Sequence, residues 1–515
     1  MKYQLRMVPI AVAGMLFFLS TFQANAQEAS PFGICAHLQS GEEHQQMPRN
    51  LRMISEAGIR WLRVDFSWAG IESPQGNWQY EHIDRVVRET EENGLHILPL
   101  LLYNVDWANP AWQHLDAWLV YVEKTVSRYK DKFRYWEIWN EPNLFWEHPN
   151  GANYKILLEA TYRKIKEIDP GIQVVYGGTS GIPSEFFEAS FKAGAGAFFD
   201  VLNVHPYRGR MTSVGLAAGY LEDLENLRKL MTKYHIADKK IWVTEMGWST
   251  WTPLNLSNRA EFHEKITGRN PEKHWKVGVM YDKNYPVKRR LSKDEISALL
   301  TDKYTIEWLR IPDLKTKDLK QYDALFFPPW EIYPVARLWD ELLPAFNYGL
   351  RGGKMFFYGD VEVTEENQAE GLPQSILLSL RFGIERYFWY EFQAPEYNSF
   401  DREDRFGIVH RNLEPKPAYF AYATLCKLYP EGSKVDMSVE WNRKNCCIVS
   451  WTQPSGVRVW AIWSPGGTQR VPVKIGKGLQ QVYDYTGKAL PAAETAKTLS
   501  VGPGVTYLVG PQTLE

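Results

Sequence analysis

The segment Trp136-Glu137-Ile138-Trp139-Asn140-Glu141-Pro142 is an apolar, aromatic run that stops abruptly at Asn-Glu-Pro. Its apolar and aromatic residues favour a strand, and a carboxylate at the mouth of a buried strand is a candidate catalytic acid. A second run, Ile241-Trp242-Val243-Thr244-Glu245-Met246-Gly247-Trp248, has the same design, with one glutamate before a glycine. The two glutamates suggest a carboxylate pair. Glycoside hydrolysis uses such a pair, because one carboxyl group protonates the leaving oxygen and the other attacks the anomeric carbon or activates water.

Further β-rich runs accompany these two and alternate with helical patterns, which implies parallel strands joined by crossovers. The predicted strands are Phe32 to His37, Arg60 to Phe66, Leu95 to Leu102, Tyr135 to Asn140, Gln173 to Gly177, Val201 to His205 and Lys240 to Glu245. The predicted helices between them are Tyr80 to Asn93, Trp112 to Lys130, Tyr154 to Ile168 and Ala218 to Tyr234. Seven such units, with an eighth strand expected, predict a (β/α)8 TIM barrel; a doubly wound open sheet is the alternative. In such barrels the chemistry lies at the carboxyl ends of the strands, where Glu141 and Glu245 fall on strands four and seven.

The eighth strand, Glu385 to Glu391, comes late, after a predicted small α/β domain at residues 269–359. The strands predicted there are Lys276 to Tyr281, Thr305 to Ile311, Ala324 to Phe327 and Lys354 to Tyr358, and the helices are Lys293 to Lys303 and Pro334 to Tyr348. No Gly-x-Gly-x-x-Gly or Walker pattern accompanies them, so a nucleotide role is not expected. Packing, or a homo-oligomer formed through this insertion, is favoured over direct substrate binding.

Four predicted regions follow along the chain. Residues 1–26 are a signal peptide, 27–268 and 360–430 form the barrel, 269–359 are the insertion, and 431–515 form a β-sandwich. The barrel resumes with a helix from Gln374 to Phe382 and ends with one from Pro417 to Leu428. After Pro430 the sequence changes to short alternating runs separated by Gly and Pro, which is typical of antiparallel sheets.

The N-terminus predicts export to the periplasm or the extracellular space. An apolar stretch from Met7 to Phe22 follows Lys2 and Arg6, and Ala24-Asn25-Ala26 matches a signal cleavage site. The stretch is shorter than the ~20 residues of a spanning helix, so a membrane anchor is the less favoured alternative and no membrane association is expected after signal removal. The four cysteines do not form a disulfide framework; buried thiols are favoured, and a single bridge stays possible.

Charge and motif content exclude several partner classes. The formal net charge of −2, with both signs spread along the chain, gives no field that would attract nucleic acid or an anionic membrane. No Cys or His spacing matches a metal site, and two carboxylates suffice for the chemistry, so neither a metal nor another cofactor is expected.

Several motifs resemble clan A of the glycoside hydrolases, nearest to families 39 and 5, over about Pro31 to Gly268 and Asp360 to Pro430. They are Arg63 in Trp61-Leu62-Arg63-Val64-Asp65, the run Ile71 to Trp78, the Asn140-Glu141 pair and His205-Pro206-Tyr207. This resemblance implies a retaining β-glycosidase. Glu141 is then the general acid/base and Glu245 the nucleophile, while Asn140 bonds the sugar 2-hydroxyl. Tyr207 lies near the nucleophile, His205 lines the site, and Trp389 forms the floor of the sugar subsite.

Physical reasoning supports these roles. Glu245 must stay ionised, so Arg63 and Tyr207 are expected to donate hydrogen bonds to it, whereas Glu141 must hold a proton. Glu137 lies four residues before Glu141 and faces the same side, so it is expected to be a buried partner within the barrel. His37 is a candidate sugar ligand at the end of strand one. The alternatives left open are a structural or a substrate role for Glu391, and stacking subsites at Trp107, Trp248 and Trp251.

The preferred hypothesis is an exported retaining β-glycosidase that cleaves O-glycosidic bonds of a polysaccharide or oligosaccharide substrate. A non-catalytic carbohydrate-binding protein on a degenerate barrel is a second hypothesis, but it predicts loss of a catalytic glutamate and both are present. A transglycosylase is a third, and no motif separates it from a hydrolase. The sugar, the linkage and the choice between endo and exo cleavage stay open, because the insertion before strand eight could overhang the cleft.

Overall fold

The computed structural model describes most of the chain after residue 29. The described residues are 30–144, 151–250, 274–282, 292–294, 297, 304–327, 344–345, 348, 354–357, 363–396, 403–472, 475–491 and 498–514. The predicted signal peptide at 1–26 lies outside them, as do Trp251 and most of the two helices predicted within the insertion.

Eight parallel strands close into a barrel, as predicted. They are β1 (Phe32–Cys35), β2 (Trp61–Ser67), β3 (His96–Leu102), β4 (Tyr135–Ile138), β5 (Gln173–Tyr176), β7 (Val201–His205), β8 (Lys240–Met246) and β13 (Arg386–Trp389). The late strand β13 pairs with β8 on one side and β1 on the other. The ring closes where Val175 of β5 pairs with Val201 of β7. This closure excludes the open doubly wound sheet.

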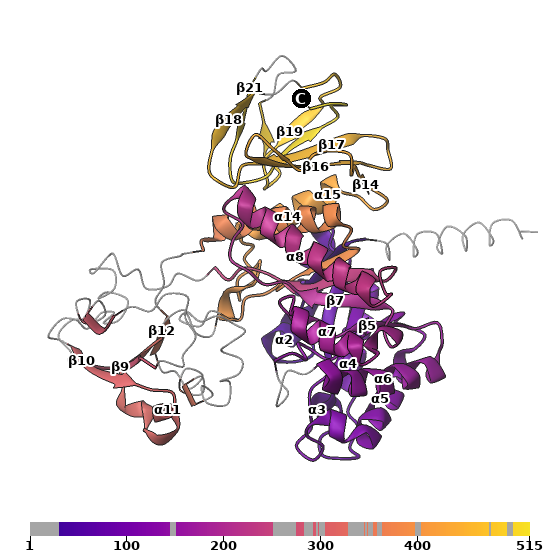
Figure 1. Ribbon diagram of the computed structural model, residues 1–515, viewed down its shortest axis with the longest axis vertical. Coiled ribbons are helices and arrows are strands. Elements are labelled where there is room, and N and C mark those ends of the chain that lie inside the picture. Colours follow the sequence, from indigo (N-terminus) through magenta and orange to yellow (C-terminus); the bar gives the residue numbers. More distant parts are fainter. Residues whose placement is uncertain are drawn as a thin grey trace, which may run out of the picture.

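Helices surround the strands on the outside (Figure 1). Those predicted from the sequence are α4 (Glu81–Glu92), α5 (Leu115–Tyr129), α6 (Gly151–Ile168), α8 (Val214–Lys233), α14 (Glu365–Phe382) and α15 (Pro417–Leu428). Three were not predicted: α2 (Gly41–Glu56), the single turn α3 (Trp68–Ile71) and α7 (Ser184–Lys192). Helix α14 also begins earlier than predicted, because Thr364 and Asn367 form a capping box at its start and Pro373 is accommodated within it.

The barrel strands are buried on both faces. One face packs against the helices, and the other fills the barrel with side chains that include Trp61, Trp242 and Phe388. Parallel strands covered on both sides carry apolar residues at nearly every position. A polar side chain inside this barrel therefore needs a hydrogen-bond partner.

The insertion contains a parallel sheet of its own, between β8 and β13 in the sequence. Its strands are β9 (Trp275–Met280), β10 (Tyr304–Leu309), β11 (Ala324–Phe327) and β12 (Lys354–Phe357), in the order β10-β9-β11-β12. A short helix, α11 (Asp313–Thr316), follows β10. Met280, Leu309 and Leu325 belong to a separate small core. The four strands match those predicted, to within a few residues at their ends.

The C-terminal region is antiparallel. Its main sheet contains β14 (Lys434–Val435), β15 (Asn442–Arg443), β16 (Cys446–Thr452), β17 (Arg458–Trp463), β19 (Gln481–Tyr483), β20 (Ala489–Leu490) and β22 (Thr506–Val509), and β18 (Gln469–Pro472) pairs with β21 (Thr498–Val501). These sheets lie beyond α14 and α15, at the top of Figure 1. The Trp451 indole donates to the carbonyl of Leu428 at the end of α15 (2.7 Å), which ties the two regions together.

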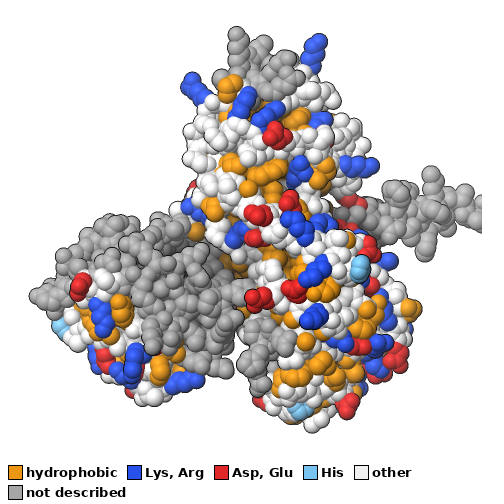
Figure 2. Space-filling view, in the orientation of Figure 1, with side chains coloured by type: hydrophobic (Ala, Val, Ile, Leu, Met, Phe, Trp, Pro, Cys, Tyr) orange, Lys and Arg blue, Asp and Glu red, His pale blue; other side chains and the backbone are white. Residues whose placement is uncertain are grey.

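The distribution of charges on the surface and the state of the cysteines match what the sequence led us to expect. Basic and acidic side chains are interspersed on the face shown in Figure 2. All four cysteines are buried and free, as favoured from the sequence. Within the described residues, no helix has the length and apolarity needed to cross a bilayer.

Candidate active site

A buried ion pair forms the base of the site. Arg63 of β2 donates from Nε to Glu137 Oε2 (2.7 Å) and from Nη2 to Glu137 Oε1 (2.9 Å), so the two side chains pair in a fork. Glu137 of β4 is fully buried, and it accepts further bonds from the Asn203 amide (2.9 Å) and the Gly178 N–H (3.2 Å). The structure thus places Glu137 inside the barrel, as the sequence led us to expect.

Glu245, at the end of β8, is bonded by the two donors expected for it. Arg63 Nη1 donates to its Oε1, and the Tyr207 hydroxyl donates to its Oε2 (3.1 Å). Burial raises the pKa of Glu245, while the Arg63 guanidinium opposes that rise. One guanidinium therefore connects Glu137 and Glu245, and it stabilises the ionised form of the latter.

Glu141 lies just beyond β4 in a left-handed backbone conformation (φ 44°). Its N–H donates to the carbonyl of Gly178 (2.8 Å), and Asn140 beside it accepts from Arg63 Nη2 (2.8 Å). Few non-glycine residues adopt positive φ, and those that do cluster at functional sites. Burial, and then the negative charge of Glu245, raise the pKa of Glu141 well above its usual range. Glu141 is the carboxyl group better suited to hold a proton.

His205 of β7 lies between the two carboxylates. Its Nδ1 is 3.2 Å from Glu141 Oε1 and 3.6 Å from Glu245 Oε2, and its Nε2 is 2.9 Å from the Thr244 hydroxyl. The ring is fully buried, and burial together with the charge of Arg63 lowers its pKa well below the usual range. This environment therefore favours the neutral imidazole form of His205.

One atom each from Glu141, His205 and Glu245 lie within 4.8 Å of one another, a spacing that would also suit a metal ion. Arg63 and Tyr207 already bond the two oxygens of Glu245, so its negative charge is compensated without a metal ion. We therefore interpret these three residues as an acid–base site. The closeness of the carboxylates fits the retaining arrangement, in which the carboxyl groups lie roughly 5 to 5.5 Å apart, better than the wider inverting one.

His37 follows β1 and pairs with Glu391, which follows the neighbouring strand β13. Its Nε2 lies 3.1 Å from Glu391 Oε2, and its backbone N–H donates to Glu43 Oε2 (3.0 Å). The His37 side chain is 40% exposed, while that of Glu391 is buried. Although burial opposes it, Glu391 raises the pKa of His37 to about 10, and burial raises the pKa of Glu43 to about 8. Glu391 thus has a structural partner, and His37 keeps an accessible edge.

Trp389 does not reach the site. Its side chain is fully buried on the helix side of β13, against Trp248 (ring centroids 5.5 Å apart). Neighbouring side chains on a strand point to opposite faces, so Tyr390 points into the barrel instead. Its ring lies near Tyr207 (6.3 Å) and His37 (6.0 Å). The floor position expected for Trp389 is therefore available to Tyr390.

Tyr103 is an aromatic residue that the sequence did not single out. It follows β3 with φ 68° and is 43% exposed. Burial and the charges of Asp65, Glu245 and Glu141 raise the pKa of its hydroxyl. Of the other aromatic candidates, Trp248 is buried with its indole bonded to the Arg208 carbonyl (2.9 Å), and Trp107 packs edge-on against Trp68. An aromatic residue directly after a strand was the only available signal for Tyr103, and many packing residues share it.

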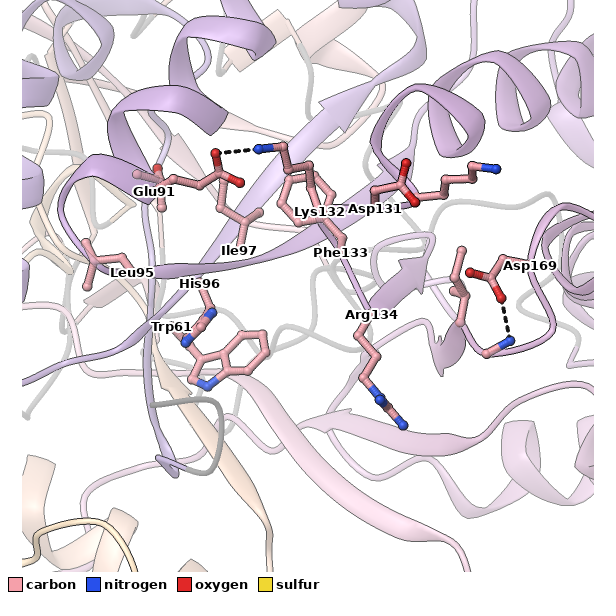
Figure 3. Close-up of a pocket in the computed structure, with 14 residues that line it drawn as sticks. Trp61, Glu91, Leu95, His96, Ile97, Asp131, Lys132, Phe133, Arg134 and Asp169 are labelled. Atoms are coloured by element: carbon pink, nitrogen blue, oxygen red, sulfur yellow. Dashed lines mark hydrogen bonds and ion pairs between the residues drawn. The ribbon is translucent and has the colours of Figure 1, made fainter. Parts of the chain in front are cut away.

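A cavity of about 460 Å³ opens at the other end of the barrel (Figure 3). It is lined by the starts of β2 and β3, including Trp61 and His96, and by residues 130–134, 169, 171 and 172. Glu91 pairs there with Lys132 (2.8 Å). None of the candidate residues lines this cavity, and in barrels of this kind the amino ends of the strands serve stability.

Comparisons with known proteins match short stretches of this chain to glycoside hydrolase sequences. The glycoside hydrolase family 42 model, described as beta-galactosidase, matches residues 39–117. A beta-xylosidase from Geobacillus stearothermophilus is 31% identical over 119 residues, which are 21% of this chain and 23% of that protein. The chain therefore aligns with less than a quarter of the length of this curated relative.

Solved structures match over most of the chain. A family 39 glycoside hydrolase from Bacteroides cellulosilyticus WH2 superposes with a TM-score of 0.64 at 19% identity, covering 94% of this chain and 82% of that one. The chain therefore has the (β/α)8 barrel fold of this structure. A second structure, a family 39 beta-xylosidase from Caulobacter crescentus, gives a TM-score of 0.53 at 14% identity and covers 94% and 96% of the two chains. At these identities the superpositions establish the fold.

Proposed function

We propose that this protein is a retaining β-glycoside hydrolase in which Glu245 is the nucleophile and Glu141 the general acid/base. The observation that carries the proposal is the closeness of these carboxylates in unequal surroundings. Glu245 receives hydrogen bonds from Arg63 and Tyr207, whereas burial and the charge of Glu245 raise the pKa of Glu141 and favour its protonated form. Two carboxyl groups whose environments separate their proton affinities take opposite roles.

The reaction then runs in two displacements. Glu245 attacks the anomeric carbon while Glu141 gives its proton to the departing oxygen, which forms a glycosyl ester on Glu245. Glu141, now a carboxylate, next takes a proton from water as that water attacks the same carbon. The second attack breaks the ester, releases the sugar with its original anomeric configuration and restores both groups.

The remaining site residues would position the sugar. Asn140 is held by Arg63 and is placed to bond the sugar 2-hydroxyl, while Tyr390 offers a ring as the floor. Tyr103 and the open edge of His37 offer further contacts. The names of the matched relatives make β-xylosides and β-galactosides the first substrates to test.

Proton NMR of an aryl β-xyloside and an aryl β-galactoside during turnover tests the mechanism. We expect the β-anomer of the free sugar to appear first and to mutarotate later. A 2-fluoro glycoside should trap the ester, and mass spectrometry of peptides should locate it on Glu245. Initial release of the α-anomer, or a label on a different residue, would overturn the assignment. Products longer than the substrate would instead indicate glycosyl transfer.

We also propose that the protein is exported after cleavage before Gln27, on the basis of the N-terminal sequence. Expression with and without residues 1–26, followed by N-terminal sequencing of the exported fraction, tests this. A protein retained in the cytoplasm with Met1 intact would contradict it.

A further inference from the structure

Thr244 precedes the proposed nucleophile on β8, and its hydroxyl lies at the centre of a buried polar cluster. Oγ1 is 2.7 Å from Asn203 Nδ2, 2.9 Å from His205 Nε2 and 3.3 Å from Glu137 Oε1. Thr244 and Asn203 are both fully buried. A hydroxyl has one hydrogen to donate, so these three contacts cannot all be served by donation from Thr244.

The orientation of Asn203 settles the first contact. The Thr244 N–H donates to Asn203 Oδ1 (3.2 Å), which fixes the carbonyl side of the amide. Nδ2 then donates to Glu137 Oε1 (2.9 Å) and to the Thr244 hydroxyl. The hydroxyl accepts from Asn203, and its own hydrogen has two available acceptors, Glu137 and His205.

Each choice fixes one tautomer of neutral His205. When Thr244 donates to Glu137, His205 carries its hydrogen on Nε2 and donates it to Thr244. Nδ1 is then a bare acceptor facing Glu141, which matches a protonated Glu141. When Thr244 donates to His205 instead, the ring carries its hydrogen on Nδ1 and donates it to Glu141, which matches a carboxylate. The imidazole stays uncharged in both arrangements.

We propose that Thr244 is a positioning residue that matches the tautomer of His205 to the protonation state of Glu141. The proposal rests on the proposed function, because the two states of Glu141 are the acid needed for the first displacement and the base needed for the second. The hydroxyl turns between two acceptors inside the barrel, and it touches neither the sugar nor the attacking water.

Other groups around Glu141 also affect its proton affinity. Glu245 from β8 and Glu403 after β13 raise the proton affinity of Glu141, while Arg63 from β2 and the Ser180 hydroxyl lower it. Arg63 also faces His205, and Glu137 faces Thr244. Replacing Thr244 with valine, which has a similar shape, leaves all of these charges in place.

The Thr244→Val variant tests the proposal through its pH profile. Without the hydroxyl, a hydrogen on Nε2 of His205 has no acceptor in a buried site, so the Nδ1–H tautomer is favoured. That tautomer donates to the Glu141 carboxylate and lowers the pKa of Glu141. The alkaline limb of kcat/KM should therefore move to lower pH, by about one pH unit. Thr244→Ser keeps a hydroxyl and should restore the wild-type limb.

Three outcomes would overturn the proposal: an unshifted limb in the valine variant, a shift to higher pH, or the same change in valine and serine variants. Substrates with good leaving groups add a second readout, since their first displacement should be less sensitive to Thr244→Val than that of substrates with poor ones.

An NMR measurement on the wild-type protein needs no turnover. Imidazole ¹⁵N shifts distinguish a protonated ring nitrogen from a bare one, and the His205→Asn variant assigns the signal. Below the alkaline limb we expect hydrogen on Nε2 and a bare Nδ1. An imidazolium or an Nδ1–H tautomer there would reject the proposal even in an active enzyme. If the expected tautomer is found in a protein that hydrolyses nothing, the proposed function fails separately.

Discussion

Two arginines point into the barrel and have different neighbours. Arg63, near the carboxyl ends of the strands, bonds two carboxylates and an amide. Arg386, at the start of β13, lies over the rings of Trp61 (4.0 Å), Trp242 (4.5 Å) and Tyr135 (4.9 Å). Ring faces attract the cation without introducing a group that can donate or accept protons. The carboxylates of the candidate site thus surround Arg63, whereas Arg386 lies among aromatic rings.

The largest effect on activity should come from Glu245→Gln, a change at the carboxyl ends of the strands. Because it removes the nucleophile while keeping the shape and the donors around it, turnover of an aryl β-xyloside or β-galactoside should fall by at least about 1,000-fold. The melting temperature should stay within a few degrees of the wild-type value. Residual activity above about a tenth of wild type would reject the nucleophile assignment.

Paired substitutions test the difference between the two arginines directly. Arg63→Met leaves Glu137 buried without its cation, so we expect a loss of about 3–5 kcal/mol in the free energy of unfolding. Arg386→Met removes contacts with three aromatic rings, so a loss of about 2 kcal/mol is expected, with near-normal kcat/KM. Urea denaturation measures both. Equal losses, or loss of activity in the Arg386 variant alone, would contradict this division.

Tyr103→Ala should affect binding and spare stability. If the exposed ring stacks on a sugar, KM should rise about three- to tenfold with little change in kcat, which corresponds to the energy of one aromatic contact. Tyr103→Phe keeps the ring and serves as the matched control. An unchanged KM for every oligosaccharide that the enzyme cleaves would exclude the stacking role.

A smaller effect concerns stability at alkaline pH. The pKa of His37 is raised to about 10, so its contribution is full below its ordinary value of 6.5 and is lost as pH rises through 10. Glu43 adds to the trend, because its pKa of about 8 makes ionisation costly in the folded state above its ordinary 4.5. The melting temperature should fall between pH 7 and 10. Glu391→Gln should flatten this fall, while Glu414→Gln, at an exposed position, should not.

The sequence was sufficient for the barrel, because β-rich runs and helical patterns alternate through it. It was insufficient for α2, whose sequence is polar and contains Pro48 within the helix. The proline disfavours a helix, and only five buried side chains on one face, including Met47 and Leu51, reveal its packing. Their burial depends on tertiary packing, which the local sequence of the helix does not reveal.

The face assignment on β13 failed for a different reason. Tyr387, Phe388, Trp389 and Tyr390 are all aromatic, so no polar residue marks which side is the interior. The register with β8 also shifts between Tyr387 and Trp389. Conversely, the sequence predicted that Glu137 would have a buried partner, because a glutamate inside a barrel needs a cation or several donors. The structure shows that this partner is Arg63. The pairing of His37 with Glu391 depends on β13 lying next to β1 in the closed barrel, and the distance between these residues cannot be read from their sequence spacing.

The position of β13 has a consequence for synthesis on the ribosome. Strand β1 emerges first, yet one of its two neighbours is encoded after residues 247–385. Until Arg386 leaves the exit tunnel, the nascent barrel carries two open strand edges, on β1 and on β8, and such edges invite pairing with other chains. The entropy of closing a loop grows only slowly with its length, so the detour is thermodynamically mild. The consequence is a delay during which these strand edges stay unpaired, and chaperones are suited to protect a nascent chain in that state.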